Sequence, residues 1–317
     1  MLTIKEAAFS VGFDACGIAK AEELTEDAAF LAEWLSEGYH ADMHYLERNF
    51  EKRVDPRKLV PDCKSIVVVL MNYFPWQKQD TQSPRIAKYA FSSTDYHKVL
   101  KTKLKELEAI ITENYGEECV SRTHQHSFVD SAPVLERRWA QRAGLGWIGK
   151  NTQLIHPGLG TYTFIGVLML NIEVDYDTPI LPHCGNCICC IDACPTQALN
   201  NGTMDARKCI SYQTIENKNL IADEFHNSLS NCAYGCDICA DVCPWNKKWA
   251  KTHNHPEFNI ATNSENQPLT EWNKEFWLNL TKEEFAGIFK KSAIQRAGYE
   301  KFKQNIEILN NTNKLIG

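Results

Sequence analysis

The cysteines between positions 184 and 243 have the type and spacing of iron–sulfur cluster ligands. A first run reads C-x2-C-x2-C-x3-C-P, and its cysteines are Cys184, Cys187, Cys190 and Cys194. A second run reads C-x2-C-x3-C-P, and its cysteines are Cys236, Cys239 and Cys243. In runs of this kind three thiolates hold one cluster and the last cysteine binds the other cluster. The sequence therefore predicts two [4Fe–4S] clusters with crossed ligation.

Crossed ligation places Cys243 with the first three cysteines and leaves the second cluster one ligand short. The second cluster takes Cys194, Cys236, Cys239 and either Cys209 or Cys232, and spacing does not decide between the last two. Cys189 is out of register, and we expect a buried free thiol there. Disulfides are disfavoured because residues 1–6 show no secretory signal. Zinc usually takes paired C-x2-C motifs with a long spacer, unlike the tight run found here.

Composition limits the class of protein. The chain has 317 residues, of which 44% are apolar and 23% charged, as expected for a globular protein with a core. No apolar run approaches the roughly 20 residues of a membrane helix. We therefore expect a soluble, cytoplasmic protein without membrane contact. The net charge of −6 means that nucleic-acid binding requires a local basic surface.

Candidate basic surfaces occur in three stretches. Taken singly, each stretch is interpreted as the solvent-exposed face of a helix. The stretches contain Lys98, Lys101, Lys103 and Lys105; Arg137, Arg138 and Arg142; and Lys247, Lys248 and Lys251. Together with Trp147, Trp245 and Trp249 they are compatible with a phosphate backbone and stacked bases.

Hydrophobic patterning predicts three parts. Residues 1–178 form an α/β domain with strands at 13–21, 65–72 and 161–173, a possible strand at 120–129, and helices at 3–12, 26–36, 95–115 and 133–143. The β-branched run at 65–72 is typical of a strand buried on both faces. Residues 179–250 form the two-cluster domain. Residues 251–317 form a helical segment that packs on the core, with helices near 272–280, 282–292 and after Gly298.

Four further motifs admit more than one interpretation. Gly144-x-Gly146-x-x-Gly149 follows a helix and leads to a strand, the reverse of a dinucleotide site, which favours close backbone approach to a flat or anionic cofactor. Asp130 precedes a predicted helix, and its position alone favours an N-cap over a buried proton donor. His44 lies in D-x-H-x-x-E rather than the D-x-H-x-x-G of some cobalamin proteins, and we interpret it as a surface residue. His124 and His126 alternate on the possible strand but lack a third metal ligand.

The ordered combination of motifs resembles the epoxyqueuosine reductase family, cobalamin-dependent iron–sulfur enzymes that complete queuosine in tRNA. The resemblance covers the chain to about Gly298 and rests on five segments. They are Y-A-x4-D-Y-H at 89–97, V-D-S-A-P at 129–133, G-W-I-G-K-N at 146–151, C-I-S-Y at 209–212 and G-C-D-x-C-x2-V-C-P-W-N at 235–246. Longer members carry C-terminal helical repeats, and the resemblance does not carry over to this sequence any tRNA contact that those repeats make.

The resemblance implies an α+β fold: a nitroreductase-like cobalamin-binding domain, a ferredoxin-like two-cluster domain and a short helical tail. Base-off cobalamin would lie between the first two parts. Asp130 becomes the catalytic acid, Cys209 the eighth cluster ligand and Cys232 a spare cysteine. The implied cofactor-binding residues are Arg53, Ser93 (or Ser92), Asp130, Gln153, Leu154, Ser211, Tyr212 and Asp237. The implied partners are tRNA carrying epoxyqueuosine and an external low-potential electron donor, with the protein acting as a monomer.

The chemistry agrees with these parts. Converting an epoxide to an alkene consumes two electrons and two protons and releases water. Because each cubane carries one electron at a time, a cofactor that reaches a two-electron-reduced state, such as cob(I)alamin, is needed. A carboxyl group kept protonated by burial would serve the departing oxygen. The alternatives are a reductive dehalogenase, a ferredoxin-type electron carrier, or a flavin protein.

Overall fold

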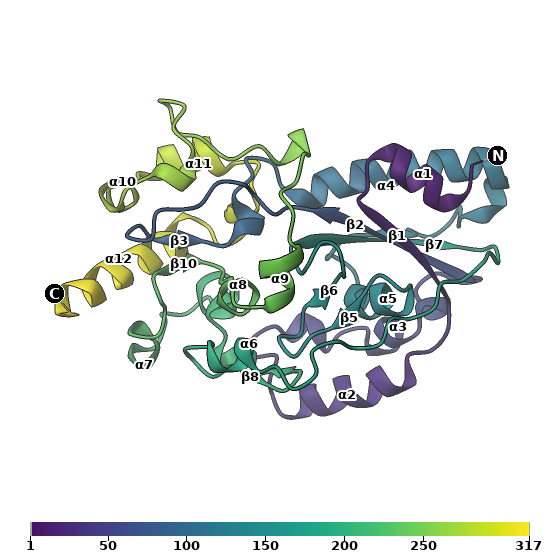
Figure 1. Cartoon of the computed structure of the whole chain (residues 1–317), viewed down its shortest axis with the longest axis horizontal. Helices are drawn as coiled ribbons and strands as arrows, with labels where there is room; N and C mark the ends of the chain where they lie inside the picture. Colours follow the sequence, from purple (N-terminus) through teal and green to yellow (C-terminus); the bar gives the residue numbers. More distant parts are fainter. Residues whose placement is uncertain (1, 317) are drawn as a thin grey trace.

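The structure, a computed structural model, describes residues 2–316 and is built around a four-stranded sheet (Figure 1). The strand order is β1-β2-β7-β4, and every neighbouring pair is antiparallel. The strands are β1 (Ala15–Lys20), β2 (Ser65–Asn72), β7 (Thr163–Leu170) and β4 (Ser127–Phe128). The three long strands confirm the predicted ones. The domain is thus α+β, because its sheet contains no parallel pair.

Helices cover both faces of this sheet, which explains why β2 is buried throughout. Val67, Val69 and Met71 pack with α1 (Ile4–Val11) and α4 (Tyr96–Tyr115) on one face. The alternate residues of β2 point to the other face and pack with α5 (Glu136–Arg142). The prediction of a strand buried on both faces is therefore confirmed, whereas the expected α/β arrangement of residues 1–178 is wrong, because the sheet is antiparallel.

The predicted helix caps are largely confirmed. Thr3 and Glu6 form the capping box of α1, and Asp95 caps α4 by accepting a hydrogen bond from the His97 amide at 2.9 Å. Helix α2 (Thr25–Ser36) forms as predicted, but none of its residues is fully buried. The possible strand at 120–129 shrinks to β4. The Ser121 hydroxyl accepts hydrogen bonds from nearby amides and holds a turn there instead.

The cluster segment follows β7 and is composed of short elements. They are α6 (Cys189–Asp192), β8 (Leu199–Asn200), β9 (Thr203–Met204), α7 (Asp223–His226), β10 (Cys232–Tyr234), α8 (Ile238–Asp241) and α9 (Pro244–Trp249). Strand β10 pairs in parallel with β3 (Arg85–Ile86) of the first part of the chain. The hairpin of β5 (Trp147–Ile148) and β6 (Leu154–Ile155) and the short helix α3 (Phe50–Val54) complete the site region.

The C-terminal part forms the predicted helices α10 (Lys274–Asn279), α11 (Lys282–Phe289) and α12 (Tyr299–Ile316). Their aromatic side chains share one core with Ile86 and with Tyr234 of β10. Packing therefore runs across residue 250, while the domain boundaries at 178 and 250 stay predictions. Within the described residues, no helix has the length and apolar character needed to cross a membrane.

Candidate active site and cluster ligands

The predicted ligands of the first cluster lie together. Burial raises the pKa of the Cys190 thiol, and the nearby Cys243, Cys184 and Cys187 raise it further. This neighbourhood is the crossed set that the spacing predicts, because Cys243 comes from the second run. The backbone amides of Asn246 and Trp245, at the start of α9, donate hydrogen bonds to the Cys243 sulfur and so oppose the rise in its pKa that burial causes. Such N–H···S bonds are the kind that tune cluster potentials.

The second group gathers Cys194, Cys236 and Cys239 around Cys209. Burial raises the pKa of the Cys209 thiol to about 11; the amides of Tyr212 and Ser211 oppose this, while Cys236 and Cys194 add to it. The pKa of Cys239 is raised by burial and then by Cys236 and Cys209. Cys190 of the first group also raises the pKa of Cys239, so the two groups adjoin, as single-electron transfer requires.

Cys232 has a different environment from Cys209. It lies in β10, is 2% exposed and donates through Sγ to the Ser230 carbonyl. Cys236 is the one predicted ligand that influences its pKa. Of the two candidates for the eighth ligand, Cys209 is therefore the one that lies among the other three. Cys189 corrects an expectation: it is free but exposed, because α6 turns it towards solvent.

Asp130 is not a helix cap. Helix α5 begins at Glu136, after Leu135, so Asp130 lies six residues ahead of it. Asp130 has a φ of 55°, in the left-handed region that few non-glycine residues occupy. Its side chain is 59% exposed, which corrects the expectation of a buried acid. The strained backbone instead projects the carboxylate outward from the end of β4.

Residues at the start of α4 hold the Asp130 carboxylate. The Tyr96 hydroxyl donates to its Oδ2, and the Tyr96 ring stacks on Phe164 with centroids 4.1 Å apart. The His97 Nε2 lies 3.9 Å from the same oxygen, and the His97 Nδ1 bonds Asp95 at 2.7 Å. Because Asp95 is the N-cap of α4, the cap of that helix also orients the groups next to Asp130.

Glu136 is a residue that the sequence reasoning missed. Its Oε1 accepts a hydrogen bond from the Asp130 amide at 3.1 Å. Burial raises the pKa of Glu136 to about 8, and the neighbouring Asp130 carboxylate adds to this rise. The site therefore contains two adjacent carboxyl groups in contrasting environments, an arrangement typical of acid–base sites. The signal available in the sequence was the second acidic residue six positions after Asp130.

Arg53 and the loop at 149–154 present buried polar atoms without partners. Arg53 is 8% exposed and donates from Nη2 to the Tyr45 carbonyl at 3.3 Å, but its Nε has no hydrogen-bond partner among the described residues. The Asn151 Nδ2 and the Thr152 Oγ1 are likewise unpaired within residues 2–316. Glu136 lies near Arg53, and its neighbour Arg137 donates to the Thr152 carbonyl at 3.1 Å. Unpaired buried donors are costly, so this wall suits a polar cofactor.

The glycines before this loop serve the protein's own backbone. A side chain at Gly146, whose φ is 150°, would meet the Ile155 carbonyl at 2.2 Å. The close approach is therefore to β6 rather than to a cofactor, which corrects the interpretation of that motif. Gln153 closes the turn by accepting a hydrogen bond from the Gly149 amide at 2.8 Å, and Leu154 is buried in β6.

Asp237 joins the cluster segment to the first domain. Its Oδ2 accepts a hydrogen bond from the Lys88 amide at 2.7 Å and lies 3.5 Å from the Lys88 ammonium. Lys88 also bonds Asp241 at 2.5 Å, and Asp241 accepts from the Tyr162 hydroxyl at 2.6 Å. Asp237 therefore holds the cluster segment against the first domain through its contacts with Lys88.

The remaining predicted cofactor contacts are Ser211, Tyr212 and Ser93 (or Ser92). Tyr212 donates to Asp42 at 2.9 Å, and Ser211 precedes it beside Cys209. Ser92 is 7% exposed, and its hydroxyl is held by the Glu257 carbonyl. Ser93 is only half-buried, so it is the more accessible of the two serines.

Some surface predictions are not supported. Trp147 is fully buried against Trp245 and is not available to stack bases. Arg138 and Arg142 pair with acidic residues of the α2 region, so they are not free phosphate ligands. His126 bonds Glu108 at 3.0 Å rather than a metal-binding partner.

Two adjoining cysteine groups, together with an accessible carboxylate in the same chain, are the features of a two-cluster iron–sulfur oxidoreductase. A family model described as a 4Fe-4S double cluster binding domain matches residues 183–246, and one described as Epoxyqueuosine reductase QueG, DUF1730, matches residues 53–131. The epoxyqueuosine reductase of Cellulophaga algicola is 44% identical over 96% of each chain, and that of Xanthomonas campestris pv. campestris is 37% identical over 96% of this chain and 84% of the relative. The chain belongs to the epoxyqueuosine reductase family.

Solved structures agree with this assignment. A crystal structure of epoxyqueuosine reductase with an epoxyqueuosine-modified tRNA-Tyr stem loop has a TM-score of 0.84 and 32% identity, over 98% of this chain and 80% of that one. A structure of the Bacillus subtilis enzyme, whose catalytic aspartate loop is swung out of the active site, has a TM-score of 0.84 and 31% identity over 98% and 81%.

Proposed function

We propose that this protein reduces epoxyqueuosine to queuosine at the wobble position of tRNA. The observation that carries the proposal is 44% identity to an epoxyqueuosine reductase across 96% of both chains. The relative solved with a modified tRNA stem loop supports tRNA as the substrate class. We further propose that the protein works as a monomer in the cytoplasm, with a local basic surface for the anticodon stem-loop.

Electrons would enter one at a time from an external low-potential donor. We assign one cluster to Cys184, Cys187, Cys190 and Cys243, and the other to Cys194, Cys209, Cys236 and Cys239. The proximity of Cys239 to Cys190 supports transfer from one cluster to the next. The reaction consumes two electrons and two protons, breaks both carbon–oxygen bonds of the epoxide, forms a carbon–carbon double bond and releases water.

The wall formed by Arg53 and the loop at 149–154 fits base-off cobalamin in a nitroreductase-like domain. The fit rests on the unpaired Arg53 Nε, Asn151 Nδ2 and Thr152 Oγ1, which are donors suited to the amide side chains and phosphate of that cofactor. Other wall residues would be Ser93, Gln153, Leu154, Ser211, Tyr212 and Asp237. When bound, cobalamin supplies a cobalt centre that stores two electrons for the carbon–oxygen cleavage.

Asp130 would deliver the proton to the departing epoxide oxygen. Its carboxylate is accessible, because the side chain is 59% exposed, and the Tyr96 hydroxyl donates a hydrogen bond to one of its oxygens. Because the Asp130 side chain is exposed, substrate and cofactor must exclude water from it before it can be held protonated. Glu136 keeps the Asp130 amide in place and, because its pKa is about 8, adds no full negative charge at neutral pH.

The test is anaerobic reconstitution with cobalamin, a chemical reductant and tRNA bearing epoxyqueuosine, followed by nucleoside analysis. Conversion to queuosine is expected, with tRNA lacking the modification as control. No conversion by protein loaded with both clusters and corrinoid would refute the proposal. A ferredoxin-type carrier would show no corrin absorbance after loading, and a flavin protein would release a fluorescent flavin on denaturation.

A further inference from the structure

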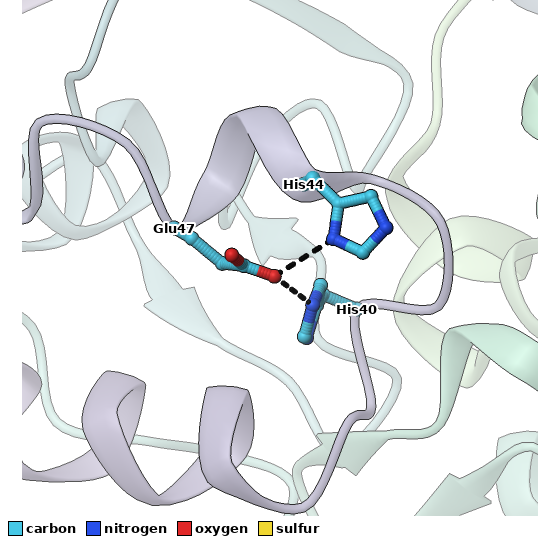
Figure 2. A group of neighbouring side chains, drawn as sticks. All are labelled: His40, His44 and Glu47. Atoms are coloured by element: carbon cyan, nitrogen blue, oxygen red, sulfur yellow. Dashed lines mark hydrogen bonds and ion pairs between the residues drawn. The ribbon is translucent and has the colours of Figure 1, made fainter.

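His40, His44 and Glu47 form a compact group with the composition of a transition-metal site (Figure 2). The His40 Nε2 lies 2.7 Å from Glu47 Oε1, and the His44 Nδ1 lies 2.9 Å from the same oxygen. One ligand atom from each residue lies within 4.8 Å of the other two. Two imidazoles and one carboxylate are the protein ligands of many open zinc sites.

The geometry needs little adjustment to hold an ion. Ligands about 2.0–2.1 Å from a tetrahedral zinc ion lie roughly 3.3 Å apart. The two nitrogen–oxygen distances would therefore open by about 0.6 Å and about 0.4 Å, which is within rotamer relaxation. Hydrogen bonds from His44 and then His40 lower the pKa of Glu47, so its carboxylate is in the charged form that binds metal.

Part of the group is already rigid. His40 is 7% exposed, and its ring packs near the rings of Trp34 and His44, with centroids 6.0 and 5.8 Å away. The side chains of His44 and Glu47 are 65% and 48% exposed, so the outer coordination positions face water. The three residues fit within one short loop, H-x3-H-x2-E, which keeps the entropic cost of assembly low.

We propose that His40, His44 and Glu47 bind one borderline divalent cation, zinc by preference, with water completing the coordination. Nitrogen-rich sites with one carboxylate favour zinc and its neighbours over magnesium or calcium. The His40 Nδ1 is buried and has no hydrogen-bond partner within residues 2–316. Since a metal-bound imidazole normally donates from its other nitrogen, affinity is expected to be about 10- to 100-fold below that of a fully supported site.

The proposed site lies in the segment 39–47, which contacts the cluster segment and also contacts Arg53. The Tyr39 carbonyl next to His40 accepts from the Ala206 amide at 2.8 Å, and Asp42 bonds Tyr212 of the cluster segment. Within the same loop, the Tyr45 carbonyl accepts from Arg53. An ion there would tie down the chain between Arg53 and the Cys209 region, and its three ligands are distinct from the predicted cluster ligands and from Asp130.

The test uses holoprotein that carries about eight irons per chain, so that cysteines are not free to take zinc. The protein is exposed to a modest molar excess of zinc chloride, desalted and analysed for zinc and iron. About one zinc per chain is expected in the natural protein, with iron unchanged. H44A and E47Q should retain at least about tenfold less zinc, because each loses one of three ligands. Both positions are exposed, so folding is not at risk.

The matched control is H124A, which removes an exposed histidine outside the group. It should take up zinc like the natural protein. A second readout is the thermal midpoint, which zinc should raise in the natural protein and in H124A but not in H44A. The proposal is overturned if the natural protein retains no zinc, if H44A and E47Q retain as much, or if zinc uptake is matched by iron loss.

Discussion

The backbone amide of Asp130 donates a hydrogen bond to the Glu136 carboxylate at 3.1 Å. This contact joins the end of β4 to the first turn of α5 and holds Asp130 in its left-handed conformation. In a Bacillus subtilis relative the catalytic aspartate loop is swung out of the active site. In this chain the Asp130 segment is held by the Glu136 contact and by the Tyr96 hydroxyl.

Replacing Asp130 by Asn should abolish most turnover while cofactors stay bound. The amide keeps the size of the side chain but cannot deliver a proton, and general-acid catalysis is worth about 10²–10⁴-fold. Single-turnover conversion of modified tRNA measures the loss, and iron content with the corrin spectrum serves as control. Y96F, which removes only the orienting hydroxyl, should lose less. Full activity of D130N would contradict the role of Asp130.

Replacing Glu136 by Gln should change the pH dependence of stability. The folded pKa of Glu136 is about 8, above its usual value near 4.5, so the folded state binds the extra proton. Stability from this group is greatest at low pH and falls as pH rises from about 4.5 to about 8. A difference of one between the folded and unfolded pKa corresponds to about 1.4 kcal/mol of stability.

Glu136→Gln keeps the acceptor for the Asp130 amide but cannot ionise. Its free energy of unfolding should therefore fall less than that of the natural protein between about pH 5 and about pH 8.5, which urea titrations at both pH values would measure. Parallel pH profiles for the two proteins would show that Glu136 does not titrate in this range.

Replacing Cys209 by Ala should remove one cluster. The remaining iron should fall from about eight to about four per chain, because the other group keeps its four thiolates. C232A should retain both clusters, although loss of a buried thiol lowers its stability. C189A, at an exposed position, is the neutral control. Iron analysis under anaerobic conditions measures the number of clusters. If C232A lost half of its iron and C209A kept all of it, Cys232 rather than Cys209 would be the eighth ligand.

Replacing Lys88 by Met should loosen the junction between the two halves. The change leaves Asp237 and Asp241 without their shared cation, and Asp237 is only 12% exposed at its side chain. We expect a loss of about 3 kcal/mol, because breaking a buried ion pair strands a charge. The urea midpoint for loss of cluster absorbance measures it. K98M, on the exposed side of α4, should have the urea midpoint of the natural protein. If K88M also has that midpoint, the ion pairs of Lys88 do not stabilise the contact between the two parts.

Features that depend on local chemistry could be predicted from the sequence. The spacing of the two cysteine runs predicts two clusters and their crossed ligation, and a model of a double-cluster domain covers that segment. The caps of α1 and α4 and the buried strand β2 followed from residues close together in the chain. Each of these signals works within a few residues, so no knowledge of packing was needed.

The fold was needed for whatever depends on segments distant in sequence. Spacing left Cys209 and Cys232 equivalent, and only the folded chain places Cys209 beside Cys194. Asp130 was interpreted as a helix cap because local propensity cannot show that α5 starts later and that Tyr96, from another helix, holds the carboxylate. The antiparallel sheet and the burial of Glu136 likewise arise from how covered faces pack together, and packing is a property of the whole chain.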